Sequence, residues 1–317
     1  MSYAVTIKKE ISNIKSSESE LIAELSGYFR NNANILSDKI TMTTENKFTV
    51  DRIINALKTV FDINANVSII ENLNFSKKEL YQIIVDKNII KLLKDLGIYD
   101  ENNSYLETVP NYIVGANEEI RAYLRGVFSS VGSINDPKTS RYHMELLVSR
   151  PEEAVFVQKL LNIFELNAKI LNRDKNYMIY IKEAEKISDF IKLLGANNAV
   201  MYYENVRIYR DQKNKTNRLN NCEQANMDKV IQTATTQLEE IRRIEENDGL
   251  MLLDDKTLET LQYRKKYPEA SLKELAEIIS LETNKTITKS GLSHRLRKIK
   301  ELAMQFEEID KKRSSSE

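Results

Sequence analysis

A cluster of basic and hydroxyl side chains near the C-terminus has the residue types that contact DNA. Residues 289–300, KSGLSHRLRKIK, hold five lysine or arginine residues and no acid. At helical spacing, Leu292, Leu296, Ile299 and Ala303 form one apolar face. Arg and Lys bind phosphates and guanine edges, and Ser and His bond to base edges or phosphates, which favours a helix in the major groove. The side chains that we expect to contact DNA are Lys289, Ser290, Ser293, His294, Arg295, Arg297, Lys298 and Lys300. The alternative is a solvated basic face on an ordinary three-helix bundle.

Two further helices must position this one. A helix that ends at about Tyr267, before Pro268, is followed by a second helix that opens with a capping box of Ser271 and Glu274. The sequence therefore predicts an all-helical DNA-binding domain at 251–308. The segment 280–288, SLETNKTIT, is longer than the 3–4-residue turn of a tight helix-turn-helix.

A second basic stretch precedes this domain. Residues 205–221 hold five basic side chains against one acid, Asp211, and residues 224–247 then become acidic. We interpret 206–250 as a helical linker, basic and then acidic. Its basic side chains contact phosphates or form a solvated helix face, and the sequence favours neither. The side chains concerned are Arg207, Arg210, Lys213, Lys215 and Arg218.

The N-terminal two thirds contain a weak internal repeat. The segment 20–35, ELIAELSGYFRNNANI, is similar to 119–134, EIRAYLRGVFSSVGSI, and the repeat aligns Gly27 with Gly126. A glycine inside a helix costs about 1 kcal/mol relative to alanine, so two at matched positions favour a close helix-packing seam over tolerated interruptions.

Similar patterns follow each copy. Alternating stretches at 38–43 and 142–149 precede amphipathic patterns at 48–62 and 152–165. Two short β-rich runs and a last helix then close each half. The predicted fold is an α+β domain at 1–205 with two αββαββα halves, at about 1–112 and 113–205, followed by the all-α domain. Residues 309–317 are expected to form a disordered tail.

The combination of these segments resembles one family over nearly the whole chain. Residues 124–132 have the shape of the LAGLIDADG motif of homing endonucleases. Together with NRLNNCEQAN (217–226), YPEASLKELAEII and KSGLSHRLRKI, they are similar to the WhiA family of Gram-positive bacterial regulators. The resemblance implies a pseudo-twofold LAGLIDADG-like domain joined to a helix-turn-helix like region 4 of sigma factors. It also implies transcription control in cell division, chromosome segregation and sporulation.

The resemblance also locates two positions where the nucleases carry metal-binding acids. Here these positions hold Asn32 and Val131, and neither provides a charged oxygen ligand for a divalent ion. Asp136 lies past the helix end, where we expect it to support the turn Asn135-Asp136-Pro137. We therefore expect no enzyme, no catalytic residue, no metal and no cofactor. A nuclease with a relocated metal site remains one alternative, and a scaffold that docks another transcription regulator or RNA polymerase is another.

Composition sets the remaining limits. The 317 residues have a formal net charge of zero, which argues neither for nor against double-stranded DNA as the partner. Cys222 is the only cysteine, so no intrachain disulfide forms, and we expect a small buried thiol rather than a redox sensor. The sequence shows no signal peptide and no run of the ~20 apolar residues that span a membrane. We expect a cytoplasmic, nucleoid-associated protein.

Overall fold

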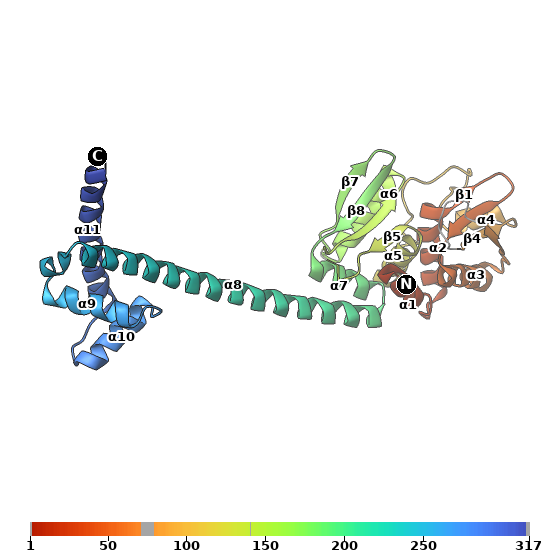
Figure 1. Cartoon of the computed structure of the whole chain (residues 1–317). Coiled ribbons are helices and arrows are strands. Elements are labelled where there is room, and N and C mark those ends of the chain that lie inside the picture. The colour runs from red at the N-terminus through yellow and green to blue at the C-terminus, as the bar shows by residue number, and fades with distance from the viewer. Residues whose placement is uncertain (1, 71–78, 140, 315–317) are drawn as a thin grey trace. The chain divides into compact units, whose positions relative to one another are not determined.

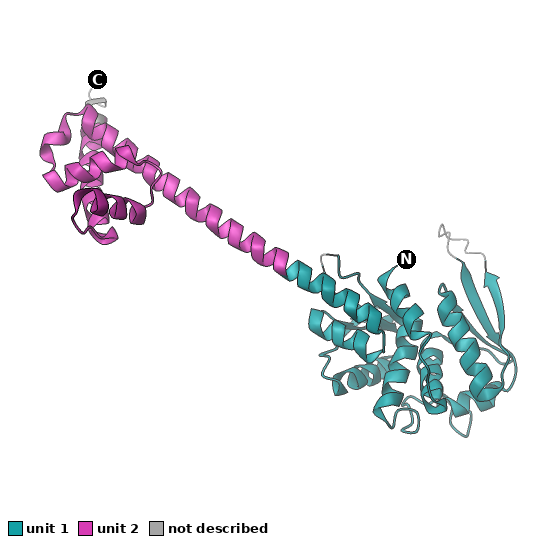
Figure 2. Ribbon diagram, turned by 90° about the horizontal axis from the view of Figure 1, so that it is seen from below, with its two compact units in different colours: residues 1–211 teal, residues 212–317 magenta. Residues whose placement is uncertain are grey.

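The structure is a computed structural model that describes residues 2–70, 79–139 and 141–314. The chain forms two compact units, residues 1–211 and residues 212–317, shown in teal and magenta in Figure 2. The boundary between the two units lies close to residue 205, where the first domain was expected to end. The expected linker does not form a separate part, because the division between the units falls inside one helix.

The predicted αββαββα order is confirmed in both halves of the first unit (Figure 1). The first half contains α2 (Glu18–Asn32), β1 (Asn34–Ile35), β2 (Ile40–Thr44), α3 (Lys47–Phe61), β3 (Asn66–Ile70), β4 (Leu80–Val85) and α4 (Ile89–Asp95). The second half contains α5 (Asn117–Val131), β5 (Gly132–Ile134), β6 (Met144–Val148), α6 (Pro151–Ile163), β7 (Lys169–Arg173), β8 (Asn176–Ile181) and α7 (Ala184–Leu193).

Each half forms one antiparallel four-stranded sheet. The strand orders correspond, β1-β2-β4-β3 and β5-β6-β8-β7. In the second sheet Leu146 of β6 lies opposite Ile179 of β8, and both side chains are fully buried. In the first sheet Met42 lies opposite Ile83, and both are buried in the same way. Because side chains alternate across a strand, one face of each sheet covers the core of its own half.

One helix of the first unit was not expected from the sequence. The helix α1 (Tyr3–Ile11) buries Tyr3, Ile7 and Ile11, spaced four residues apart, in the core of the second half. The Tyr3 hydroxyl donates to the carbonyl oxygen of Ala199 at 2.7 Å. The helix is only nine residues long, and such helices are stabilised by tertiary packing rather than by local propensity.

The second unit is helical throughout its described part. The helix α8 (Asn197–Glu246) begins in the first unit and ends in the second, followed by the 3₁₀ helix η1 (Gly249–Leu252), α9 (Asp255–Lys266), α10 (Leu272–Thr283) and α11 (Lys289–Ser314). Ile241 and Ile244 of α8 are buried in the same core as Leu275 and Leu292. The helical core of this unit therefore uses residues upstream of the expected domain boundary at 251.

Two sequence-based expectations about this unit are wrong. Cys222 is exposed on α8 rather than buried, because it lies within a stretch of that helix, residues 211–229, in which every residue is exposed. The expected tail does not begin at residue 309, because α11 continues to Ser314. Residues 315–317 of that expected tail lie outside the described residues.

Candidate nucleic-acid interface

The helices α2 and α5 approach each other closely at the two matched glycines. A Cβ atom on Gly27 would lie 2.3 Å from the carbonyl oxygen of Tyr123, and one on Gly126 would lie 2.0 Å from that of Glu24. Both contacts are with backbone of the facing helix. The absence of side chains at these positions lets the two helices pack backbone to backbone.

Buried ion pairs tie the same seam together. Arg125 of α5 is 5% exposed, and its Nη2 lies 3.3 Å from Oε1 of Glu20 on α2. Glu24, which is 2% exposed, accepts from Arg52 of α3 at 2.7 Å. On the other side, Glu153 of α6 accepts from the hydroxyl of Tyr123 at 2.5 Å. The acids close to the seam are therefore already paired with arginine or hydrogen-bonded.

The two positions that the resemblance aligns with the metal-binding acids of nucleases have other roles here. The Asn32 amide donates to the carbonyl oxygen of Thr43 at 3.1 Å and accepts from the Thr43 N–H at 2.9 Å, so it holds the end of α2 against β2. Val131 packs half-buried against the core of the second half. Asp136 accepts from the N–H of Lys138 at 2.9 Å, as a turn residue does. No group of three or more His, Cys, Asp or Glu residues in the described part of the chain could hold a metal ion.

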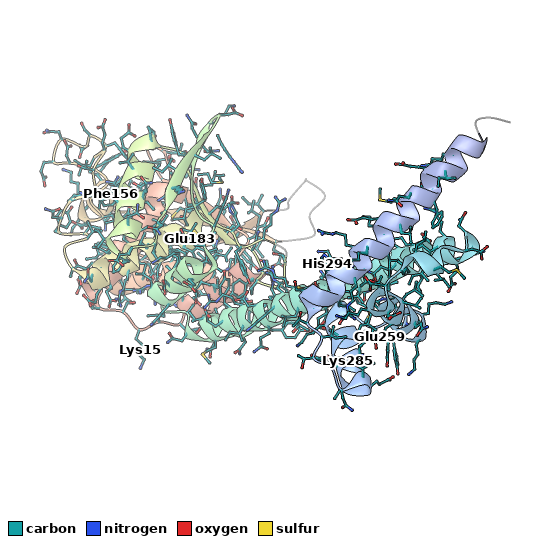
Figure 3. All side chains as sticks on the ribbon, turned by 90° about the vertical axis from the view of Figure 1, so that its left-hand side faces the viewer. Lys15, Phe156, Glu183, Glu259, Lys285 and His294 are labelled. Atoms are coloured by element: carbon teal, nitrogen blue, oxygen red, sulfur yellow. The ribbon has the colours of Figure 1, made fainter. Side chains whose placement is uncertain are left out.

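The amphipathic pattern of α11 is present in the second unit. Leu292, Leu296 and Ile299 are at most 4% exposed in its core. The opposite face, marked by His294 in Figure 3, is open to solvent. Within the described ranges, the side chains of Ser290, Ser293 and His294 make no hydrogen bond or ion pair, and neither does that of Lys289. The exposed predicted residues are Lys289, Ser290, Ser293, His294, Arg297, Lys298 and Lys300.

Two residues of the predicted set contact α9. The guanidinium of Arg295 donates to the carbonyl oxygen of Lys256 and to the hydroxyl of Thr260, both at 3.3 Å. The ammonium of Lys298 donates to Asp254, the N-cap residue of α9, at 2.8 Å. Lys298 is the main reason why the pKa of Asp254 lies well below its usual range. Both side chains therefore fix α11 against α9 in this structure.

The turn between α10 and α11 is shorter than the sequence suggested. The helix α10 continues to Thr283, and Asn284, in the left-handed conformation at φ 53°, ends it. Residues 284–288 alone then form the turn, and Thr288 caps α11 by accepting from the N–H of Gly291 at 3.1 Å. A five-residue turn between two packed helices is close to the helix-turn-helix geometry.

Models of three domains from one family match this chain. The WhiA N-terminal LAGLIDADG-like domain matches residues 18–99, the WhiA LAGLIDADG-like domain matches 120–213, and the WhiA C-terminal HTH domain matches 216–303. The chain belongs to the WhiA family.

Similar proteins agree with the three domain matches. The probable cell division protein WhiA of Bacillus cereus is 39% identical over 307 residues, which are 96% of this chain and 96% of the relative. The protein of the same name from Brevibacillus brevis is 36% identical over 312 residues, 97% of this chain and 98% of its own. The crystal structure of full-length DUF199/WhiA from Thermatoga maritima has a TM-score of 0.58 at 24% identity, covering 96% of this chain and 99% of that one. The last likeness supports the fold alone.

The basic linker of this WhiA-family chain divides into two parts. Arg207 pairs with Glu204 and Glu185, and Arg210 donates to the carbonyl oxygens of Pro137 and Thr139. These two side chains therefore hold the start of α8 to the first unit. The remaining predicted phosphate contacts are exposed on α8, and the structure gives them no hydrogen bond or ion pair with any residue that it describes: Lys213, Lys215 and Arg218.

One residue of the HTH module was missed by sequence reasoning. Arg264 of α9 is 1% exposed, although arginine is among the residues that are rarely buried. A signal was present, because Arg264 follows Leu261 by three residues and so lies on the apolar stripe of α9.

No helix within the described ranges is long and apolar enough to cross a membrane.

Proposed function

We propose that this chain is a non-catalytic, DNA-binding transcription regulator that acts in cell division and chromosome segregation, with the N-terminal turns of α11 in the major groove. The HTH match and the names of the relatives support the general role. The groove assignment is supported by the exposed side chains of α11. A cytoplasmic, nucleoid-associated location follows from DNA as the partner.

The observation that carries the proposal is the exposed face at the start of α11. From Lys289 to Lys300 the helix holds no acid, and its apolar back is fixed in the core of the unit. Small or flexible side chains at the N-terminal end, Ser290 and Ser293, let the backbone approach a base pair closely. The exposed His294 and Arg297 are one turn further along the same face.

The ion pair of Arg297 does not prevent DNA contact. Its Nε lies 3.5 Å from Oε1 of Glu301, and both side chains are about two-thirds exposed. Exposed i,i+4 pairs contribute only about 0.3–0.5 kcal/mol, so a guanine edge or a phosphate can replace the glutamate.

DNA affinity of the full chain tests this assignment. The DNA for this test is a duplex from a genomic fragment that the wild type binds. The double variant His294→Ala/Arg297→Ala should bind this duplex at least tenfold more weakly than the wild type does, since each good base contact contributes ~1–3 kcal/mol. Fluorescence anisotropy at several salt concentrations measures both affinity and salt dependence. Removing a phosphate contact lowers the slope of log K against log salt by about 0.9, whereas removing a base contact relaxes the sequence preference.

Arg242→Ala provides the matched control. Arg242 is also an exposed arginine of the second unit in an i,i+4 pair, with Glu246, but it lies on α8. The control should keep the affinity and the sequence preference of the wild type. If the double variant binds as the control does, α11 does not read the DNA.

A further inference from the structure

A small hollow in the second unit is lined by basic side chains and by no acid. Its volume is about 250 Å³, and it lies where α8, α9 and the N-termini of α10 and α11 meet. Four of the residues that line it are cationic: Lys229, Arg264, Lys273 and Lys289. The others are Val230, Thr233, Ala270, Ser271 and Leu272.

The buried guanidinium of Arg264 lacks an anionic partner. Its Nη1 donates to the carbonyl oxygen of Ala270 at 2.7 Å, and its Nε, also buried, has no acceptor. No carboxylate in the described part of the chain pairs with it, and its burial lowers its pKa. A buried charge without a counter-charge is costly, so an anion in the hollow would stabilise this arrangement.

The N-terminus of α10 adds two unused donors. Its capping box satisfies the N–H groups of Ser271 and Glu274. The next donors, the N–H groups of Leu272 and Lys273, have no acceptor among the residues that the structure places. The first N–H groups of a helix and its dipole favour an anion at this end.

The three lysines are available to a bound anion. Lys229 and Lys289 are exposed and make no ion pair with any described residue. Lys273 lies 3.9 Å from Glu277, but the two side chains are 79% and 60% exposed, so water screens the pair.

We propose that this hollow is a binding site for a phosphate group, held by Arg264, the N-terminal N–H groups of α10 and the three lysines. The volume is below the ~300–1,000 Å³ of pockets that enclose whole small ligands. The hollow therefore fits one phosphate whose remaining atoms stay outside. A backbone phosphate of DNA and a free phosphorylated metabolite both provide this chemistry. Lys289 is also the first residue of α11, which favours DNA if the proposed function holds.

Titration of the full chain with inorganic phosphate tests the site without DNA. At constant ionic strength, phosphate should shift the NMR amide signals of Leu272 and Lys273 in a saturable way, and chloride should not. The exposed-lysine variant Lys273→Ala/Lys289→Ala should weaken phosphate binding about tenfold or more, because it removes charge-assisted hydrogen bonds. Lys256→Ala/Lys265→Ala removes two lysines of α9 outside the hollow and should leave it unchanged. Equal effects of phosphate and chloride on the two amides overturn the proposal.

DNA binding by the same variants distinguishes the two sources. A backbone phosphate predicts that Lys273→Ala/Lys289→Ala lowers the salt slope by about 0.9 for each phosphate that the variant no longer neutralises, while the control does not. A saturable phosphate titration with unchanged DNA binding instead assigns the site to a free phosphorylated ligand. If the wild type binds no DNA but the amide shifts remain, the proposed function fails and the phosphate site stands.

Discussion

Gly27 and Gly126 set the distance between α2 and α5. Each faces a backbone carbonyl of the other helix, and a backbone cannot move aside as a flexible side chain can. The repeat in the sequence identified both positions, because a matched pair of helix glycines requires a reason. It did not reveal the neighbouring ion pairs, since Glu24, Arg52 and Arg125 are far apart along the chain.

Replacing Gly126 with alanine should destabilise the first unit. Its Cβ would lie 2.0 Å from the Glu24 carbonyl oxygen, so the helices must separate. Overpacking costs about 1–3 kcal/mol, which exceeds the roughly 1 kcal/mol that alanine gains over glycine in a helix. Urea unfolding should show the loss of stability. Gly291→Ala is the control, because its Cβ would meet only the Thr288 hydroxyl at 3.4 Å. Equal stability of Gly126→Ala and wild type would show that the seam is not tight.

Lys8 should make stability depend on pH. Burial lowers its pKa from 10.5 to about 8, and its ammonium lies 5.6 Å from the centre of the Phe128 ring. Between these two pH values the unfolded chain binds more protons than the folded one, so the free energy of unfolding rises with pH. Lys8→Met should be more stable than the wild type at pH 7, and the difference should shrink from pH 8 to 10.5. Comparing the two proteins cancels the titration of the buried tyrosines. A difference that does not change with pH would contradict the pKa assignment.

The sequence predicted which side of α11 is buried and which is exposed, but not the partners of its side chains. Helical periodicity separates a buried stripe from an exposed one and says nothing about an adjacent helix. Arg295 and Lys298 contact α9, and Arg264 of α9 donates to the carbonyl oxygen of Ala270, just before α10; periodicity along one helix indicates none of these partners.

At the scale of elements, the ends of α2 and α5 carry the two positions that the resemblance aligns with the metal-binding acids of nucleases. Here the end of α2 is bonded to β2 through Asn32, and the end of α5 presents the apolar Val131. Both helix ends therefore serve packing. The order of helices and strands could be predicted, since alternating and amphipathic stretches recur in both halves. α1 and the last turns of α11 could not, because short helices and polar helix ends depend on tertiary contacts.

Supercoiled plasmid tests whether those helix ends cut DNA. Incubated with Mg²⁺ or Mn²⁺, the purified chain should leave the plasmid supercoiled, because metal-assisted cleavage needs carboxylates around the ion. Gel electrophoresis would detect nicking. Nicking that scales with protein concentration, requires the metal and disappears in Asp136→Asn would reveal a relocated site.

At the scale of the whole molecule, two units of different type share one chain. The first repeats one αββαββα arrangement about a helix seam, and the second is a helical module with an exposed basic helix face. The boundary between them was predictable only approximately. α8 continues through the basic stretch without a break, and Ile241 and Ile244 at its end complete the second core.

The most direct test of DNA recognition by α11 is a comparison of bound genomic fragments. Purified full-length wild type and His294→Ala/Arg297→Ala would each be mixed with fragmented genomic DNA, and the retained fragments sequenced. For the wild type, we predict enrichment of discrete genomic sites that share a sequence pattern. For the variant, we predict that this enrichment is lost although the protein remains folded. The same enriched sites in both proteins would contradict the account.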